Sequence, residues 1–191
     1  MNEELFVDDA EKAILVLQQG GIILYPTDTI WGIGCDATNA DAIEKIIALK
    51  QRPVHKSFVV LVASEKDILQ YTAAPDLAVF DYLKTVKKPT TVIYEHALLL
   101  AENVCNDDGS VAIRICREDF CKYLLKRFRK PIVSTSANIS GEFSPSNFAS
   151  ISNLIKQGVD YIVQYKQQDN STAEASSIVR WKNGTVEIIR S

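Results

Sequence analysis

Residues 22–56, I-I-L-Y-P-T-D-T-I-W-G-I-G-C-D-A-T-N-A-D-A-I-E-K-I-I-A-L-K-Q-R-P-V-H-K, carry the main argument about the fold of this chain. An apolar run over 22–25 predicts a short buried strand, which Pro26 ends. A polar, glycine-rich loop follows, and the apolar spacing over 40–50 predicts an amphipathic helix. Basic residues come directly after that helix, so strand, loop, helix and cations form one continuous segment.

This segment carries the groups that an anionic small molecule needs. The loop offers two hydroxyls, a carboxylate and an aromatic ring, at Thr27, Thr29, Asp28 and Trp31. The positive charges stand at the helix end and just after it, at Lys50, Arg52 and Lys56. Arginine binds a phosphate through two nitrogens and lysine adds a compact charge, although cations also complement the dipole at a helix C-terminus. We predict that the segment forms half of a nucleotide and amino-acid pocket.

The run G-I-G-C-D-A at 32–37 matches the G-x-G-x-x-A fingerprint of dinucleotide-binding proteins. That fingerprint requires an acidic residue about 20 positions further on, and the corresponding region here is basic. Residues 26–31 also separate the glycines from the preceding strand. The sequence therefore argues against a dinucleotide site, and it contains no G-x-x-x-x-G-K-[S/T] phosphate loop.

A second hydroxyl-rich segment, S-T-S-A-N-I-S-G at 134–141, follows another apolar run. Such residues can simply form Asx and Ser turns, but beside the cationic loop they supply neutral donors for a phosphate or ribose. Arg114 lies in V-A-I-R-I, a run otherwise typical of a buried strand, where an unpaired charge is costly. Two interpretations of Arg114 stay open: a salt bridge to an internal carboxylate, or a side chain that points into the pocket.

Strands and helices alternate through the middle of the chain. Strands are expected over 22–25, 58–62, 90–94, 111–116, 131–134 and 159–163, and helices over 8–19, 40–50, 64–71, 76–85, 118–129 and 146–157. A terminal hairpin is expected around Asn183-Gly184, and 165–175 is a polar loop. The pattern predicts an α/β fold: one domain over 1–191, with a twisted sheet of parallel and antiparallel strands covered by helices.

Composition and charge bear on nucleic-acid binding, metal sites and location. The 191 residues are 47% hydrophobic with a net charge of −3, so a polyanion could bind only through a local patch. The run K-R-F-R-K at 126–130 is either such a patch or a solvated helix face. The four cysteines form no C-x-x-C pair, and we expect neither a zinc site nor another metal site built by the protein. With no apolar run long enough to cross a membrane and no signal-peptide core, a cytoplasmic location is expected.

Four motifs resemble the YrdC family of threonylcarbamoyl-AMP synthases over residues 10–190: Y-P-T-D-T-I-W-G-I-G-C-D-A, K-Q-R-P-V-H-K, V-A-I-R and S-T-S-A-N-I-S-G. The resemblance implies a YrdC/RibB-like fold in its short, single-domain form. It also implies a nucleotidyltransferase that makes threonylcarbamoyl-AMP and pyrophosphate from L-threonine, bicarbonate and ATP, with Mg²⁺ entering with ATP and no dedicated protein ligands. The product serves threonylcarbamoyladenosine formation in tRNA, so a transferase complex that uses threonylcarbamoyl-AMP is an implied partner. tRNA or double-stranded RNA could bind directly through a local basic patch.

The resemblance also implies residue roles. Lys50 and Arg52 are the expected catalytic residues. The expected ATP-binding residues are Lys50, Arg52, Lys56, Thr91, Ser136, Asn138 and Arg190. The expected threonine-binding residues are Thr27, Thr29, Trp31, Arg114 and Ser176.

The chain departs from the family pattern at several positions. Trp31 stands where tyrosine or phenylalanine is usual, Lys87-Lys88-Pro89 replaces P-G-P, Cys116 replaces a proline, and Leu61 replaces a histidine found in some members. The alternative function is an RNA-binding or ribosome-maturation module of the same fold, similar to the YciO branch and without synthase activity. It predicts salt-sensitive RNA binding through residues 126–130.

Overall fold

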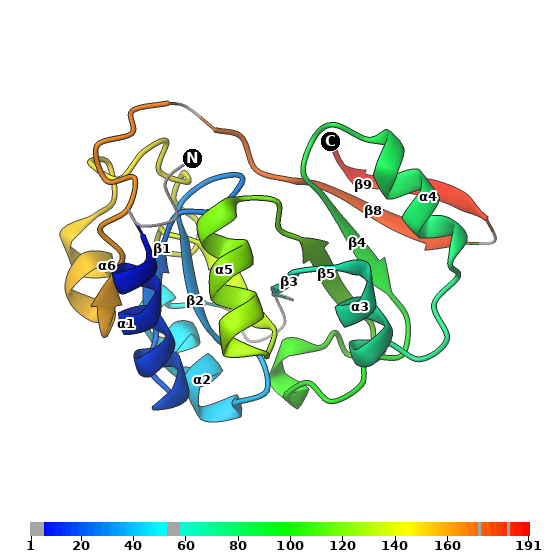
Figure 1. Ribbon diagram of the computed structural model, residues 1–191, viewed down its shortest axis with the longest axis horizontal. Coiled ribbons are helices and arrows are strands. Elements are labelled where there is room, and N and C mark those ends of the chain that lie inside the picture. The colour runs from blue at the N-terminus through cyan, green and yellow to red at the C-terminus, as the bar shows by residue number, and fades with distance from the viewer. Residues whose placement is uncertain (1–5, 53–57, 172, 183) are drawn as a thin grey trace.

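The computed structural model describes residues 6–52, 58–171, 173–182 and 184–191 (Figure 1). Its helices are α1 (Val7–Gln18), α2 (Ala40–Lys50), α3 (Glu65–Tyr71), α4 (Ala78–Thr85), the 3₁₀ turn η2 (Glu102–Val104), α5 (Asp119–Phe128) and α6 (Asn153–Gly158). Its strands are β1 (Ile23–Tyr25), β2 (Gly32–Asp36), β3 (Val59–Val62), β4 (Thr90–Tyr94), β5 (Val111–Ile115), β6 (Ile132–Ser136), β7 (Tyr161–Ile162), β8 (Ser177–Lys182) and β9 (Thr185–Arg190).

The strands of the described residues form one nine-stranded sheet in the order β7-β1-β2-β6-β3-β5-β4-β8-β9. Three neighbouring pairs are parallel: β1 with β7, β3 with β5, and β4 with β8. The other pairs are antiparallel. The predicted mixed α/β sheet is therefore confirmed, and strands far apart in sequence are neighbours at its centre.

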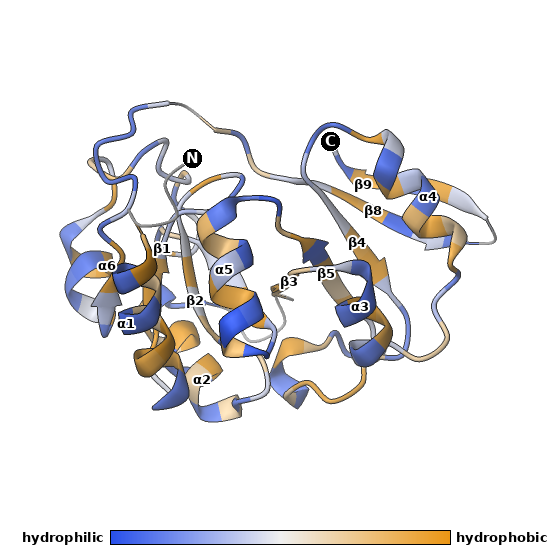
Figure 2. Ribbon diagram, viewed as in Figure 1, coloured by the Kyte–Doolittle hydropathy of each residue, from blue (hydrophilic) through white to orange (hydrophobic). Residues whose placement is uncertain are grey.

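Helices α1 and α5 cover one face of the sheet. Ala10, Ile14 and Leu17 repeat every three or four residues on α1 and pack with Phe120 and Leu124 of α5. Figure 2 shows both helices banded with hydrophobic and hydrophilic residues. A second hydrophobic cluster, which contains buried residues of α2, α3 and α4, packs against the alternate residues of the same strands. None of the helices in the described ranges has the length and apolar content needed to cross a membrane.

Strand β2 corrects the predicted loop. Residues Gly32–Asp36 were expected in a polar loop, but they are buried and pair antiparallel with both β1 and β6. Two glycines and an aspartate, which are depleted in strands, make up most of this segment, so pairing with the two flanking strands is what makes it extended. A Cβ on Gly34 would lie 2.7 Å from Cε1 of Tyr25, so the missing side chain leaves room for the tyrosine ring. These glycines belong to a strand interior rather than to a phosphate-binding turn.

One helix boundary and one strand boundary also differ from the prediction. The helix expected over 146–157 is only α6, which begins after Ser152, whose hydroxyl accepts from the Ile155 N–H at 3.4 Å. Asn147 and Ser150 form a separate turn before it, in which Asn147 Oδ1 accepts from the Ser150 N–H at 3.0 Å. Strand β6 extends two residues further than expected, to Ser136. The hydroxyl-rich segment is therefore part strand and part loop.

Polar side chains fix the ends of the helices in different ways. Asn39 caps α2, and Ser64 forms a capping box with Asp67 at the start of α3. The helix α1 begins at Val7, and Asp9 in its first turn binds to another part of the chain. Its carboxylate accepts from the Tyr161 hydroxyl at 2.6 Å and from two backbone N–H groups, at residues 164 and 165, at 2.8 Å. Asp9 therefore attaches α1 to the chain after β7.

We predict that Gly34→Ala lowers the free energy of unfolding by about 1–3 kcal/mol, because the new Cβ meets the Tyr25 ring and the Val133 carbonyl oxygen, both at 2.7 Å. Urea denaturation measures the change. Gly158→Ala is the control: the nearest atoms to its Cβ, from 2.2 Å, all belong to the flexible Leu49 side chain, which can move aside, rather than to backbone or a ring. Equal stability losses in the two variants would contradict this account.

Candidate functional site

A cavity of about 310 Å³ opens on the face of the sheet that α1 and α5 cover, beyond the part on which these helices pack. Leu61 and Ile132 pack under α1 and α5, whereas Val59 and Ser134, two residues away on the same strands, line the cavity. Residues two apart on a strand share a face, so one face supplies both the hydrophobic core and the cavity floor. The polar lining comprises Thr27, Thr29, Arg52, Arg114, Ser134, Thr135, Ser136, Ser144, Ser176 and Arg190.

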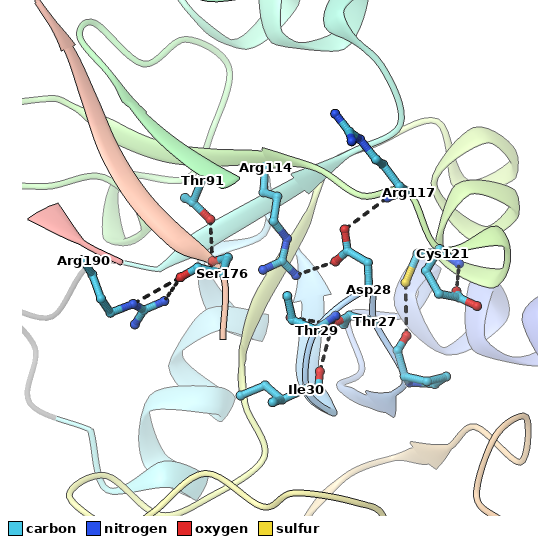
Figure 3. A network of polar contacts seen from close by, with 12 residues as sticks. Thr27, Asp28, Thr29, Ile30, Thr91, Arg114, Arg117, Cys121, Ser176 and Arg190 are labelled. Carbon is cyan, nitrogen blue, oxygen red and sulfur yellow. Dashed lines mark hydrogen bonds and ion pairs between the residues drawn. The ribbon is translucent and has the colours of Figure 1, made fainter. Parts of the chain in front are cut away.

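The loop between β1 and β2 presents its threonines to this cavity (Figure 3). The Thr27 hydroxyl donates to the Ile30 carbonyl at 2.8 Å, and the Thr29 N–H donates to Thr27 Oγ1 at 3.0 Å. The two hydroxyl oxygens are 2.9 Å apart. Because Thr27 gives its proton to Ile30, Thr29 is the donor between them, and the oxygen of Thr29 keeps its acceptor capacity.

A buried ion pair connects this loop to β5. Arg114 Nη2 lies 3.1 Å from Asp28 Oδ1, and the two side chains are 5% and 9% exposed. Arg114 also lines the cavity, so both interpretations from the sequence hold at once. Its Nε is buried and has no hydrogen-bond partner within the described residues. The pair brings a positive charge to the cavity wall while Asp28 offsets the cost of burying it.

The start of α5 holds the same loop from the other side (Figure 3). The Arg117 N–H donates to Asp28 Oδ2 at 3.2 Å, and the Cys121 thiol donates to the Pro26 carbonyl at 3.1 Å. Glu118 accepts from the Cys121 N–H at 2.8 Å and so caps the helix. Burial raises the pKa of the Cys121 thiol, so it remains a protonated donor.

Lys50 lies behind the cavity wall rather than on it. Its side chain is almost fully buried, and Nζ donates to the backbone carbonyls of Ser136 and, at 2.5 Å, Asn138. The Asn138 amide donates to the Ile139 and Glu142 carbonyls at 2.9 and 2.8 Å. The predicted lysine and the predicted serine–asparagine loop are thus brought together, with Lys50 positioning the backbone from which Ser136 reaches the cavity.

Arg52 lines the cavity from the segment after α2. Its guanidinium lies 4.5 Å from the centre of the Phe58 ring, and Nη1 is 3.5 Å from Thr135 Oγ1. Burial lowers the pKa of Arg52, which means that its charge is partly desolvated. An anion bound beside Arg52 would offset the free-energy cost of removing the guanidinium from water. Lys56, the third predicted cation, lies outside the described residues.

A chain of hydrogen bonds fixes the C-terminal wall (Figure 3). Thr91 on β4 is buried, and its hydroxyl is 2.9 Å from that of Ser176. The Ser176 carbonyl accepts from Arg190 Nε and Nη2 at 3.2 and 2.8 Å. Burial, and then the charge of Arg114, lower the pKa of Arg190. Ser176 and Arg190 line the cavity. Thr91 does not line it, but its hydroxyl holds Ser176 in place.

Trp31 forms the remaining wall. It is 7% exposed, and its ring centre lies 4.8 Å from that of Phe148, in a loop whose role the sequence did not indicate. The sequence also gave no role to Phe58 and Ser144, which line the cavity. Ser134 and Thr135 were noted only as part of a loop. The spacing of two between Ser134 and Ser136, typical of one strand face, was the signal that could have identified Ser134.

The donor set of the cavity suits an anion rather than a resident metal ion. Three arginines and a series of hydroxyls line it, and none of its lining residues in the described part of the chain is acidic. Among the residues that the structure describes, no group of three or more histidine, cysteine or acidic side chains could hold a metal. The arrangement can bind a polyphosphate and a small polar molecule side by side.

Comparisons with known proteins find relatives of this chain. A threonylcarbamoyl-AMP synthase of Vibrio parahaemolyticus is 36% identical over 139 residues, which are 71% of this chain and 75% of the relative. One from Pseudoalteromonas translucida is 30% identical over 177 residues, 91% of this chain and 94% of the relative.

Solved structures show the same fold. P. abyssi Sua5, complexed with L-threonine, superposes with a TM-score of 0.83 at 19% identity over 95% of this chain. This chain spans about half of that protein, 53% of its length. E. coli YciO gives a TM-score of 0.78 at 20% identity, covering 95% of this chain and 88% of YciO.

The family model for Sua5, YciO and YrdC, described as "Telomere recombination", matches residues 15–191. The match spans the loop after β1, the helix and arginine that follow it, the β6 loop and the C-terminal strands, which together build the cavity. This chain belongs to the Sua5/YciO/YrdC family.

Proposed function

We propose that this chain is an L-threonylcarbamoyladenylate synthase, a nucleotidyltransferase that makes threonylcarbamoyl-AMP and pyrophosphate from L-threonine, bicarbonate and ATP. The observation that carries the proposal is the cavity in which Arg52, Arg114 and Arg190 face rows of threonine and serine hydroxyls. The names of the relatives at 30–36% identity support it. The product would serve tRNA modification in the cytoplasm, through a transferase complex that accepts the threonylcarbamoyl group.

The phosphates of ATP would lie between Arg52 and Arg190. Both guanidiniums are partly desolvated, and Arg190 is additionally repelled by Arg114. An incoming polyanion relieves both penalties, so binding and charge neutralisation are coupled. The Ser136 hydroxyl supplies a neutral donor at the same wall, while Lys50, Asn138 and Thr91 act by positioning the groups that line it.

L-Threonine would bind at the loop of Thr27 and Thr29. The acceptor oxygen of Thr29 suits its amino group, and Arg114 suits its carboxylate. Trp31 provides an apolar surface for its methyl group. Ser176 lies across the cavity and can fix its hydroxyl. This assignment puts the amino acid beside the buried Asp28–Arg114 pair and away from Arg52.

The reaction then requires positioning more than protein nucleophiles. The amino group of threonine attacks bicarbonate, a new C–N bond forms, and water leaves to give N-carboxythreonine. A carbamate oxygen attacks the α-phosphorus of ATP, and the bond to the β-phosphate oxygen breaks to release pyrophosphate. Holding three mutually repelling substrates in one cavity supplies most of the rate gain, and the arginines stabilise the charge that develops on the phosphates.

Omitting either L-threonine or bicarbonate should abolish pyrophosphate release from ATP, because the carbamate is the attacking group. A coupled pyrophosphate assay tests this.

Arg52→Ala should lower the rate at least about 100-fold, the loss typical of a transition-state donor. Arg127→Ala, whose guanidinium pairs with Glu11 on α1, is the charge-matched control and should keep the wild-type rate. Pyrophosphate release without threonine would refute the proposed function.

Asp28→Asn should weaken L-threonine binding at least about tenfold and lower the free energy of unfolding by about 3–5 kcal/mol, because it leaves the buried Arg114 charge without its counter-ion. Calorimetric titration and urea denaturation measure the two effects. Asp81→Asn breaks the exposed pair with Lys84 and should change stability by less than about 1 kcal/mol. Wild-type threonine affinity in Asp28→Asn would remove Asp28 from the site.

Chelating Mg²⁺ with EDTA should stop pyrophosphate release while leaving threonine binding and stability unchanged. Among the residues that the structure describes, no carboxylate lines the cavity, so Mg²⁺ would enter on the phosphates of ATP, the usual arrangement for this ion. Calorimetry with and without EDTA provides the comparison. A loss of threonine affinity or of folding stability in EDTA would indicate a resident ion instead.

A further inference from the structure

A second cavity, of about 300 Å³, lies at the opposite end of β3. Val59 begins the strand and lines the first cavity, whereas Val62 ends it and lines the second. The second cavity is lined by residues along α3, by the end of α5 and by the segment that follows α5. Figure 1 shows where these two helices lie. The floor of the cavity is apolar, with Leu125 and Pro131 beside Val62. Of the described residues proposed to bind threonine or ATP, none lines it.

The polar rim of this cavity is mostly cationic. Lys126, Arg129 and Lys130 line it together with a single carboxylate, that of Asp67. The Asp67 carboxylate is already occupied, because its Oδ2 accepts from the Ala63 and Ser64 N–H groups at 3.1 and 2.8 Å. The rim therefore carries more positive than negative charge, although the whole chain is acidic.

Two residues of the basic run 126–130 form ion pairs with other parts of the chain. Arg127 pairs with Glu11 on α1 at 3.1 Å, and Lys130 pairs with the buried Asp36 at 2.6 Å. For Lys126 and Arg129, the structure shows no ion pair within the residues it describes. The sequence left open whether this run is a solvated face or a ligand patch, and the cavity beside Lys126 and Arg129 favours a ligand.

Tyr71 provides the second, independent observation. It is only 5% exposed, it lines the cavity, and its hydroxyl makes no hydrogen bond within the described part of the chain. Burial, and then the charges of Asp67 and Asp36, raise the pKa of Tyr71, so the phenol remains a donor at neutral pH. The Tyr71 hydroxyl is not among the fully buried polar atoms that lack a partner, so it is open to the cavity and can donate to a ligand there.

From this geometry we propose that the cavity between α3 and α5 binds a phosphate group, with the Tyr71 hydroxyl as the neutral donor and Lys126 and Arg129 as the charged ones. A phosphate offers several acceptor oxygens to donors that converge from different elements. The apolar floor leaves room for the body that carries the phosphate. The phosphate is either that of a small molecule or that of an RNA backbone, and both present the same oxyanion.

Amide chemical-shift mapping on the ¹⁵N-labelled full chain tests the proposal, because it reports where each probe binds. One arm uses inorganic phosphate and the other an RNA stem-loop oligonucleotide. Either probe should shift the amides of Ser64, Gln70 and Arg129. Phosphate alone identifies a small-molecule site, and RNA acting at much lower concentration identifies a nucleic-acid contact.

The double variant Lys126→Ala/Arg129→Ala should weaken this binding about tenfold or more, and Tyr71→Phe should weaken it without changing any charge. Arg127→Ala removes the same charge from the next position on α5 and should bind like the wild-type chain. The proposal is overturned if neither probe shifts these amides, if Tyr71→Phe binds as the wild-type chain does, or if Arg127→Ala loses as much affinity as the double variant.

Discussion

The buried pair of Asp28 and Arg114 is the interaction on which the candidate site depends most. It spans a hairpin loop near the N-terminus and a central strand, and both charges are nearly removed from water. Such a pair is tolerated only when each member has further support. The Arg117 N–H supplies that support to Asp28, and α5 fixes the adjoining Pro26 carbonyl through Cys121. Loop, strand and helix are thus held in one arrangement, and that arrangement leaves Arg114 at the cavity wall.

A second constraint is the buried ammonium of Lys50. An ammonium cannot be buried without acceptors, and here the carbonyls of Ser136 and Asn138 are among its partners. The lysine therefore determines where the β6 loop can lie. It also places Arg52, two residues further along, opposite Thr135. The shape of the cavity therefore depends on the charge of Lys50, which lies behind the wall, as well as on that of Arg52, which lines it.

Much of this could be predicted from the chain. The alternation of strands and helices gave the fold class, and Arg114 was conspicuous because a charge interrupts an apolar run. The role of Lys50 could not be predicted, since its carbonyl partners are 86 and 88 residues away. Strand β2 was missed because its two glycines and its aspartate are depleted in strands, and the segment becomes extended between two neighbours. The expected strand ended at Ser134, whereas β6 continues to Ser136, because Thr135 and Ser136 pair with Ile33 and Gly32 from a distant segment.

The C-terminal hairpin has a thermodynamic consequence for ligand binding. Strands β8 and β9 are attached to the sheet through β4 alone, at its edge, yet they bring Ser176 and Arg190 to the cavity. An edge hairpin is the kind of unit that opens locally without global unfolding. In the opened form the cavity lacks one wall. The observed binding free energy of a ligand is therefore reduced by the free energy needed to dock the hairpin. Ligand affinity and the local stability of the last fifteen residues are then linked quantities, and a change in either must appear in the other.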